Sequence, residues 1–257
     1  MEMLLKNKIA IITGASQGIG RAIAEKFSKH GATTILCSRN IDKLKLVSEE
    51  IEKITKNIAV PMSVDVSKKS DIDTVVNKVV RLFSRIDILV NNAGIQKYAP
   101  FIEMKEDLWD LHFDINVKGT FLFSQAVAKV MIKKGGGKII NLSSDSGVTP
   151  VPINASAYCS SKSAIIGLTR IIAKELGRYN IYCNAICPGG VVDTGMFENY
   201  SNTIGKGRFK IDSELTALRR LGYSEDVADV ALFFASELSR HITGEHILVT
   251  GGDIMSQ

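Results

Sequence analysis

The chain has 257 residues, of which 45% are hydrophobic and 23% charged, a composition that is ordinary for one soluble α/β domain with a large buried core. Its 32 Lys and Arg residues exceed its 27 Asp and Glu residues by 32 − 27 = 5, but they lie mostly beside acidic residues, as in residues 49–53. This mixed surface argues against a nucleic-acid-binding protein, and residues 1–8 hold no long apolar stretch that would predict a signal peptide or a membrane span.

Seven short apolar runs recur along the chain and predict strands. They are nearly continuous rather than alternating, which is typical of strands buried on both faces of a parallel sheet. Segments of helical period separate them, so we expect an α/β chain with a doubly wound, Rossmann-type fold, a seven-stranded parallel sheet and a single domain over residues 1–257. The predicted strands are residues 9–12, 34–37, 58–64, 88–90, 138–142, 181–186 and 246–249.

The first predicted strand leads into a glycine-rich turn, Thr13-Gly14-Ala15-Ser16-Gln17-Gly18-Ile19-Gly20, which opens the first helix. Glycines let the backbone turn tightly and approach a pyrophosphate, and a helix N-terminus offers unpaired N–H groups and a partial positive charge. The spacing is G-x-x-x-G-x-G rather than the general G-x-G-x-x-G. The place of the turn, between a strand and a helix, predicts a dinucleotide-binding site.

Helices are indicated where apolar residues recur three and four positions apart, as in residues 44–54 and 72–83. Gly31 suits the C-cap of the first helix, and Ser224 suits the N-cap of the last one, ahead of two acidic residues. From about residue 189 to 218 no strand is evident. Such a segment directly after a strand predicts a substrate loop or lid, with an ordinary surface excursion as the alternative.

The four cysteines are Cys37, Cys159, Cys183 and Cys187, and no two have the spacing of a zinc finger. Cys183 and Cys187 share one face of a predicted strand, too far apart to bond each other. We therefore expect four reduced thiols, no metal site and a cytoplasmic protein.

Tyr158 and Lys162 are four residues apart in a segment of helical period, which places both on one helix face. A free tyrosine has a pKa near ~10, and a nearby ammonium group favours the phenolate and lowers that pKa. Tyr-x-x-x-Lys also occurs on solvated helices, so the pair indicates proton transfer only together with other motifs.

Several motifs, in this order, resemble those of the short-chain dehydrogenase/reductase family, and the resemblance covers roughly residues 5–252. The motifs are Thr13-Gly14 to Gly18-Ile19-Gly20, Asn91-Asn92-Ala93-Gly94, Tyr158-Cys159-Ser160-Ser161-Lys162 and Pro188-Gly189. Among family members, the chain is similar to the 3-oxoacyl-[acyl-carrier-protein] reductases. The resemblance implies an NAD(P)-dependent oxidoreductase that transfers a hydride between nicotinamide and a ketone or secondary alcohol, with a homotetramer as the common assembly and a monomer as the alternative.

The resemblance also implies a catalytic role for each of four residues. Tyr158 gives a proton to the carbonyl oxygen as general acid, and Ser144, at the end of a predicted strand, hydrogen-bonds that oxygen. Lys162 holds the nicotinamide ribose and tunes Tyr158. Asn116 holds a water that links Lys162 to solvent, or satisfies a kink in its helix, and both readings are compatible.

Cofactor contacts follow from the same resemblance. Asn91 and its neighbours stabilise the sheet and line the cleft, Asp65 binds the adenine amine or caps the next turn, and Thr194 contacts the carboxamide or the pyrophosphate. The predicted cofactor-binding residues are Gly14, Ser16, Gln17, Gly18, Ile19, Gly20, Ser38, Arg39, Asp65, Val66, Asn92, Ala93, Gly94, Tyr158, Lys162, Pro188, Gly189, Val191 and Thr194.

The end of the second predicted strand favours NADP(H), with NAD(H) as the second cofactor. An NAD-binding protein usually has an acidic residue there, which would repel a 2′-phosphate. Ser38 and Arg39 offer a hydroxyl and a guanidinium instead, and the guanidinium can meet the phosphate with two hydrogen bonds. Gln17 stands where many NADP-binding relatives carry a basic residue, so we expect a moderate preference; a solvated Arg39 is the alternative.

For the substrate, the resemblance ranks a 3-oxoacyl thioester or a general ketone first, ahead of a sugar, polyol or hydroxysteroid. Thr149, Val151, Pro152 and Ile153 would form one wall of the site. Two other classes are weaker. A redox-inactive binding protein on this fold would not need Tyr158 and Lys162, and a sugar-nucleotide epimerase or dehydratase would have a longer chain and another glycine spacing.

Overall fold

The computed structural model describes residues 3–149, 152–198, 214 and 216–255. Its centre is one seven-stranded sheet in the order β3-β2-β1-β4-β5-β6-β7, and every neighbouring pair is parallel. All seven strands lie where the apolar runs predicted them. Their bounds are β1 Ile9–Thr13, β2 Thr33–Ser38, β3 Ala59–Ser63, β4 Ile88–Asn91, β5 Gly137–Leu142, β6 Ile181–Pro188 and β7 His246–Val249.

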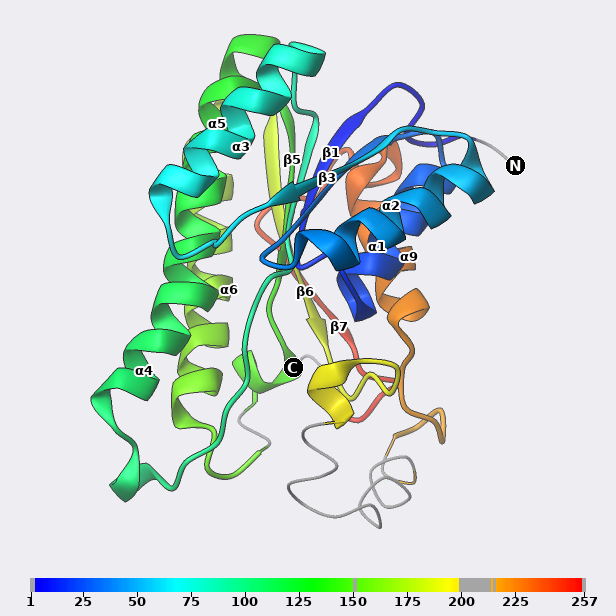
Figure 1. Ribbon diagram of the computed structural model, residues 1–257. Coiled ribbons are helices and arrows are strands. Elements are labelled where there is room, and N and C mark those ends of the chain that lie inside the picture. The colour runs from blue at the N-terminus through cyan, green and yellow to red at the C-terminus, as the bar shows by residue number, and fades with distance from the viewer. Residues whose placement is uncertain (1–2, 150–151, 199–213, 215, 256–257) are drawn as a thin grey trace.

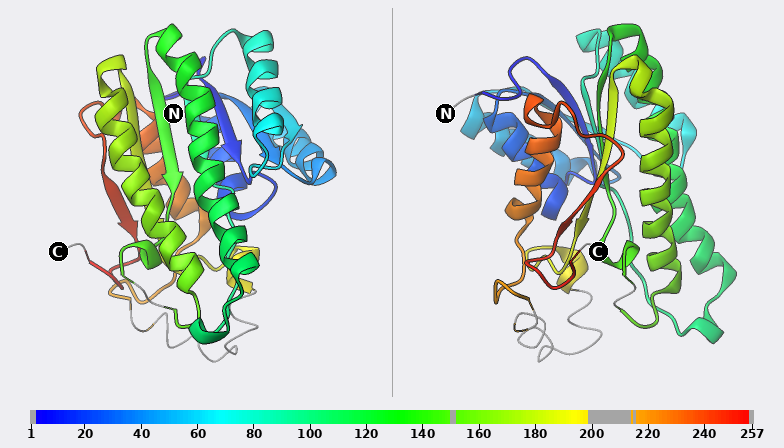
Figure 2. Two further views of the ribbon diagram at one scale, coloured as in Figure 1. Left: turned by 90° about the vertical axis from the view of Figure 1, so that its left-hand side faces the viewer. Right: turned by 180° about the vertical axis from the view of Figure 1, so that it is seen from behind.

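Helices cover both faces of this sheet, so the predicted doubly wound fold is confirmed (Figure 1). One face carries α1 Gly18–Lys29, α2 Ile41–Thr55 and α9 Ser224–Ala235. The other carries α3 Lys69–Phe83, α4 Glu106–His112, α5 Gly119–Lys134 and α6 Ser156–Leu176, and Figure 2 shows α3, α5 and α6 side by side along that face. Short 3-10 turns complete the fold at Phe101–Glu103, Asp145–Gly147, Gly177–Tyr179 and Glu237–Ser239.

Two hydrophobic cores hold the layers together, one on each face of the sheet. Successive strand residues point to opposite faces. In β1, Ile12 therefore joins the core under α1 and α9, whereas Ile11 joins the core under α3 and α5. This double burial explains why the runs are continuous in apolar residues. Pro61 is tolerated inside β3 because β3 is an edge strand.

The strand order reverses between β1 and β4, which are neighbours although two strands intervene in the sequence. In an open parallel sheet, the crevice beyond the carboxyl ends of the strands at such a point is where ligands bind. The glycine-rich turn leaves β1 at this edge, and the Asn-Asn-Ala-Gly segment leaves β4 beside it. The fold therefore brings two of the predicted motifs together.

Two local features differ from the sequence-based expectation. Ser224 is the first residue of α9 rather than its N-cap, which is Tyr223. The Ser224 backbone N–H and hydroxyl both donate to Asp193 Oδ1, at 2.8 and 2.9 Å. The Ser224 hydroxyl, which the sequence pattern assigned to helix capping, is therefore bonded to a residue far away in the sequence. Between α4 and α5, residues Phe113–Lys118 form a π-helix that contains Asn116.

Candidate active site

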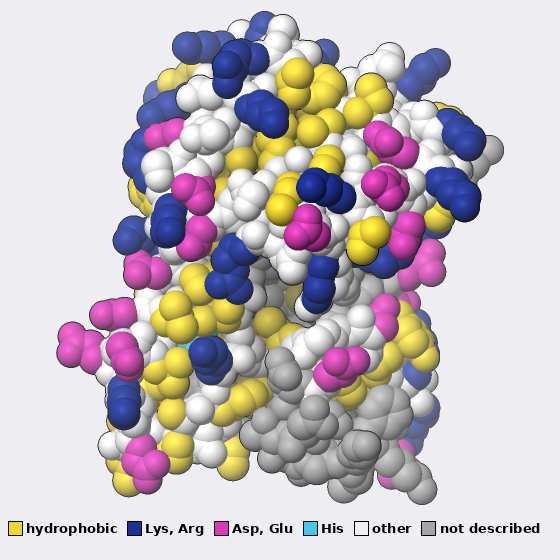
Figure 3. Space-filling model, in the orientation of Figure 1, with side chains coloured by type: hydrophobic (Ala, Val, Ile, Leu, Met, Phe, Trp, Pro, Cys, Tyr) yellow, Lys and Arg dark blue, Asp and Glu magenta, His cyan; other side chains and the backbone are white. Residues whose placement is uncertain are grey.

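A cleft of about 900 Å³ opens at the carboxyl edge of the sheet. In Figure 3 it is the hollow between the upper and lower halves of the molecule, with basic and acidic side chains along its upper rim. All the residues predicted to bind the cofactor line it except Gly20. Three of the four predicted catalytic residues line it as well, Ser144, Tyr158 and Lys162, whereas Asn116 lies behind the lining.

The glycine-rich turn is shaped for close approach by a ligand. Gly14 has φ +67°, and a Cβ there would lie 2.7 Å from Asn92 Nδ2, so a larger residue would be strained and would clash. Gln17 precedes α1 without a side-chain cap, and the first turn of α1 holds no acidic residue. The N–H groups of this turn therefore face the cleft with a partial positive charge, which fits a pyrophosphate.

Thr13 ties this turn to the segment after β4, a role that the sequence did not reveal. Its hydroxyl accepts from the backbone N–H groups of Asn92 and Ala93, at 2.9 and 3.0 Å. Asn92 Nδ2 donates back to Thr13 O at 2.9 Å. Asn91 turns away from the cleft and donates to Ser124 Oγ on α5 and to Asn141 Oδ1 on β5. Asn92 thus lines the cleft, and Asn91 stabilises the sheet.

Polar side chains surround the far end of the cleft, where β2 ends. Ser38 and Arg39 both line it, and Lys43, on the first turn of α2, adds a second basic group that sequence reasoning missed. Arg39 is exposed and makes no ion pair with a described residue. Asp65 lines the same end and accepts from the backbone and hydroxyl of Ser67, so it also caps the following turn, and these hydrogen bonds lower its pKa.

The tyrosine and lysine of α6 are both buried at the other end of the cleft, with exposures of about 5%. Lys162 Nζ lies 5.8 Å from the centroid of the Tyr158 ring and donates to Leu142 O at 2.8 Å. Burial lowers the pKa of Lys162 to about 8. Burial raises the pKa of Tyr158, and a hydrogen bond with Ser144 only partly opposes the increase. The expected lowering of the tyrosine pKa by the lysine is not seen, because desolvation penalises both charges.

Ser144 stands at the end of β5 and begins the short turn Asp145–Gly147. Its hydroxyl donates to Asp145 Oδ1 at 2.7 Å and accepts from the backbone N–H of Ser146 at 3.2 Å. Ser143, by contrast, donates to Lys162 O at 2.8 Å and so braces α6 against β5. Ser143, Ser144 and Ser146 all line the cleft, and of the three only Ser144 has a hydrogen bond that affects the pKa of Tyr158.

Asn116 is fully buried, and its amide is used in several hydrogen bonds. Its Oδ1 accepts from Ile95 N at 2.8 Å, and its Nδ2 donates to Ile95 O and to Ser161 Oγ. It thereby holds the π-helix against the segment after β4, which agrees with the structural alternative. A Cβ on Gly94 would lie 3.1 Å from Asn116 Oδ1 and 3.5 Å from Lys162 Nζ. The side chains of Asn116 and Lys162 therefore both lie next to Gly94.

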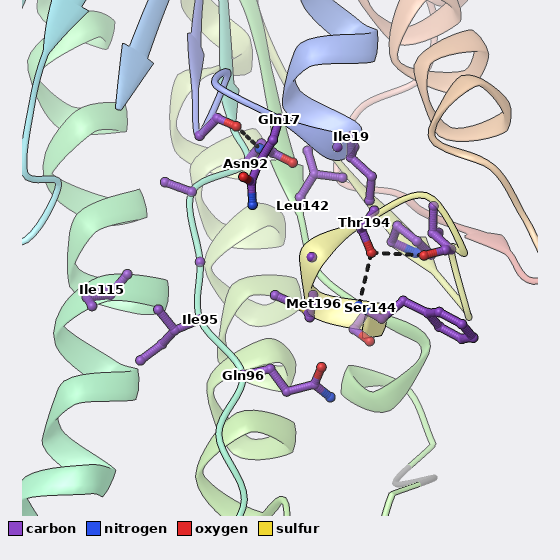
Figure 4. A pocket seen from close by; sticks show the side chains of 18 of the residues that line it. Gln17, Ile19, Asn92, Ile95, Gln96, Ile115, Leu142, Ser144, Thr194 and Met196 are labelled. Carbon is purple, nitrogen blue, oxygen red and sulfur yellow. Dashed lines mark hydrogen bonds between the residues drawn. The ribbon is translucent and has the colours of Figure 1, made fainter. Parts of the chain in front are cut away.

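The segment after β6 reaches across the cleft. Thr194 lies against the glycine turn, 3.2 Å from where a Gly18 Cβ would be, but its hydroxyl donates to Val191 O (Figure 4). Met196 Sδ lies 4.0 Å from the Tyr158 hydroxyl. Residues 199–213 and 215, most of the predicted lid, lie outside the described residues.

Of the predicted substrate wall, only Pro152 lines the cleft. Ile153 is 84% exposed, Thr149 is exposed outside the lining, and Val151 lies outside the described residues. Sequence reasoning also missed several lining residues on the substrate side, among them Gln96, which extends toward the side of Ser144 in Figure 4, Asp145 and Met196. Gln96 follows the Asn-Asn-Ala-Gly motif by two residues, a position that could have been noticed. Within the part of the chain that the structure describes, no three His, Cys, Asp or Glu residues gather as metal ligands.

The chain is similar to known proteins over nearly its whole length. Residues 14–253 match the family model described as enoyl-(acyl carrier protein) reductase. An NAD-dependent glycerol dehydrogenase of Listeria innocua is 36% identical, covering 96% of this chain and 94% of the relative. The 3-oxoacyl-[acyl-carrier-protein] reductase FabG of Thermotoga maritima is 39% identical, covering 97% and 99%.

Solved structures agree with this. A short-chain type dehydrogenase/reductase from Mycobacterium marinum superposes with a TM-score of 0.89 at 32% identity, covering 99% of this chain and 98% of that one. No described helix has both the length and the apolar character needed to cross a membrane.

Proposed function

The chain belongs to the short-chain dehydrogenase/reductase family, whose members are oxidoreductases of alcohol and ketone groups, and on that premise we propose that it is an NADP(H)-dependent carbonyl reductase or secondary-alcohol dehydrogenase. One observation carries the proposal: Tyr158, Lys162 and Ser144 meet in the cleft that the glycine-rich turn also lines. The turn fits a dinucleotide, because any side chain at Gly14 would clash with Asn92.

The bound nicotinamide would supply or accept the hydride, and this chain's residues would handle the oxygen and its proton. Tyr158 gives its phenolic proton to the carbonyl oxygen, and the raised pKa keeps that proton in place for the reduction. Ser144 donates to the same oxygen as negative charge develops. Lys162 would bind the ribose hydroxyls, and Asn116, beside Lys162 at Gly94, would hold the water that links it to solvent.

The preference for NADP(H) is supported by the side chains at the end of β2. Ser38, Arg39 and Lys43 line the cleft there, and Arg39 keeps its guanidinium unpaired among the described residues. A hydrogen bond from a charged group to a phosphate contributes about 1.5–3 kcal/mol, roughly a ten- to hundredfold preference. The relatives include the NAD-dependent glycerol dehydrogenase, so the measurement of both specificity constants decides between the cofactors.

The test is a panel of ketones, 3-oxoacyl thioesters, sugars and alcohols, with NADPH and NADH for the carbonyls and NADP+ and NAD+ for the alcohols, followed at the nicotinamide absorbance. We expect turnover of a ketone or secondary alcohol, and a higher kcat/KM with NADP(H). Turnover of no carbonyl or alcohol, despite binding of the cofactor, would support the redox-inactive alternative. An equal or better kcat/KM with NAD(H) would contradict the assignment of Arg39 to binding the 2′-phosphate of NADP(H).

We also propose a cytoplasmic homotetramer. All four cysteines are free, and three of them are buried, which suits a reducing compartment. On the face that carries α4, α5 and α6, the helices expose large apolar side chains, among them Leu111, Phe121 and Ile171. Burial of such side chains between subunits is favourable. The mass in solution, measured by light scattering, tests the assembly, and a monomer at assay concentration would contradict it.

A further inference from the structure

Asp145 is an acid held against the proposed catalytic serine, and no described Lys or Arg pairs with it. Its Oδ1 atom is the hub of the serine turn. It accepts from Ser144 Oγ at 2.7 Å, from Ser146 N at 2.5 Å and from Ser146 Oγ at 3.0 Å. These three hydrogen bonds hold the Asp145–Gly147 turn together. Oδ1 alone therefore accounts for the structural role of Asp145.

The other oxygen, Oδ2, accepts no hydrogen bond from any described residue. It points toward the segment after β6, since a Cβ on Gly189 would lie 3.5 Å from it. Both residues line the cleft. Only 9% of Asp145 is exposed, so bulk water gives this oxygen little of the solvation that a carboxylate needs. A ligand in the cleft that carries a hydrogen-bond donor would give Oδ2 the hydrogen bond that no described residue provides.

The position of such a donor follows from the proposed function, on which this inference rests. Ser144 Oγ contacts the oxygen of the reacting carbonyl, and the Asp145 carboxyl is one hydrogen bond farther along the same wall. A donor on the carbon next to the carbonyl can therefore reach Asp145 while the carbonyl oxygen faces Ser144 and Tyr158.

We propose that Asp145 determines specificity for substrates that carry a hydroxyl on the carbon next to the reacting one, which are α-hydroxy ketones in reduction and vicinal diols in oxidation. The hydroxyl is a bystander: the hydride adds to the carbonyl carbon, the proton adds to its oxygen, and the hydroxyl donates to Asp145 unchanged. A 3-oxoacyl thioester has no such hydroxyl. Asp253 also lines the cleft, and its charge acts on the Asp145 carboxyl group.

The experiment compares matched ketones that differ by one hydroxyl, acetoin with 2-butanone and 2-hydroxycyclohexanone with cyclohexanone, together with acetoacetyl-coenzyme A. The wild type should have the higher kcat/KM for the hydroxylated member of each pair. Asp145→Asn keeps an oxygen for Ser144 and Ser146 but removes the carboxylate, so it should lower the ratio within a pair about tenfold, the difference between a charged and a neutral acceptor. Asp145→Ala removes both acceptors and should abolish the preference.

Asp253→Asn is the control, because it removes a nearby charge without altering the hydrogen bonds of the serine turn; the ratio within a pair should stay close to that of the wild type. A purely structural Asp145 predicts equal losses for both members of a pair, which overturns the inference. Reduction of plain ketones or of the thioester in preference to the hydroxylated ketones overturns it too. Turnover of none of these carbonyls with NADPH or NADH contradicts the proposed function instead.

Discussion

The two ends of the cleft are built on different physical principles. The end at β1 and β2 presents backbone N–H groups, glycines, the half-buried Ser38 and the exposed Arg39. The end at β5 and α6 presents ionisable groups that are almost entirely removed from water, Tyr158, Lys162 and Asp145, and burial is the largest cause of the pKa shift of each. One end is suited to binding by shape and hydrogen bonds, and the other to chemistry that depends on protonation.

This difference has a consequence for substitutions. A buried ionisable group costs stability that an exposed one does not, and enzymes commonly accept such costs where a shifted pKa is needed. Substitutions at the β5 and α6 end, other than those of the ribose-binding Lys162, should therefore affect turnover and stability while leaving cofactor binding intact. Substitutions at β2 should change the cofactor that is used and leave the chemical step intact.

The largest effect is expected for Tyr158→Phe. The change removes only the phenolic hydroxyl, so turnover should fall by about 10²- to 10⁴-fold, the usual contribution of a general acid. The Kd for NADPH, measured by fluorescence titration, should stay near the wild-type value because the glycine turn is untouched. A variant with wild-type turnover would remove Tyr158 from the mechanism, and a variant that no longer binds NADPH would show that the two ends are not separable.

Lys162→Met tests the cost of a buried charge. The pKa of Lys162 is about 8 in the folded protein against 10.5 for an ordinary lysine, so between these values the unfolded chain holds more protons. The wild type should thus gain stability as the pH rises from about 8 toward 10, by up to about 3 kcal/mol in all, and lack that stability below pH 8. The variant should lose activity, yet be more stable than the wild type at pH 7.

Urea unfolding of both proteins at neutral and alkaline pH gives the comparison, and the difference between them isolates Lys162 from other titrating groups. The advantage of Lys162→Met should shrink as the pH rises. A variant that is less stable than the wild type at pH 7, with the same pH dependence, would show that the hydrogen bond to Leu142 O outweighs the burial of the charge.

Ser144→Ala and Ser146→Ala form a matched pair, since both hydroxyls donate to Asp145 Oδ1. Loss of the Ser144 hydroxyl should lower kcat by at least about tenfold and up to the range reported for an oxyanion donor, about 10²- to 10³-fold. Loss of the Ser146 hydroxyl should cost much less, because only Ser144 would contact the reacting oxygen. The reverse order, in kcat measured at saturating substrate, would assign the catalytic role to Ser146.

The smallest effect is expected at the nucleotide end. Ser38→Asp with Arg39→Leu should remove a preference for NADPH of roughly ten- to hundredfold and favour NADH, because the carboxylate repels a 2′-phosphate and accepts from a 2′-hydroxyl. Lys45→Leu, an exposed lysine of α2 outside the cleft lining, is the control for loss of a positive charge. The ratio of the two kcat/KM values is the measurement, and an unchanged ratio in the double variant would contradict the assignment.

The seven strands and the glycine turn could be predicted because the information is local. A strand buried on both faces must be apolar at nearly every position, and a tight turn at a helix N-terminus needs glycine, so both are legible in a few consecutive residues. The same holds for Tyr158 and Lys162, which the period of one helix places together. The family resemblance then selected Ser144 and Asn116 from their order along the chain.

The remaining features depend on partners that are far away in the sequence. Ser224 is not an N-cap because Asp193, 31 residues before it, takes its hydroxyl, and Asn116 is enclosed by Ile95 and Ser161. Met196 reaches Tyr158 only because the segment after β6 crosses the cleft. The direction of the pKa shifts also follows from tertiary burial. Spacing alone predicts that Lys162 lowers the pKa of Tyr158. The packing around both side chains instead removes the water that either charge would need, and this desolvation is the largest cause of both pKa shifts.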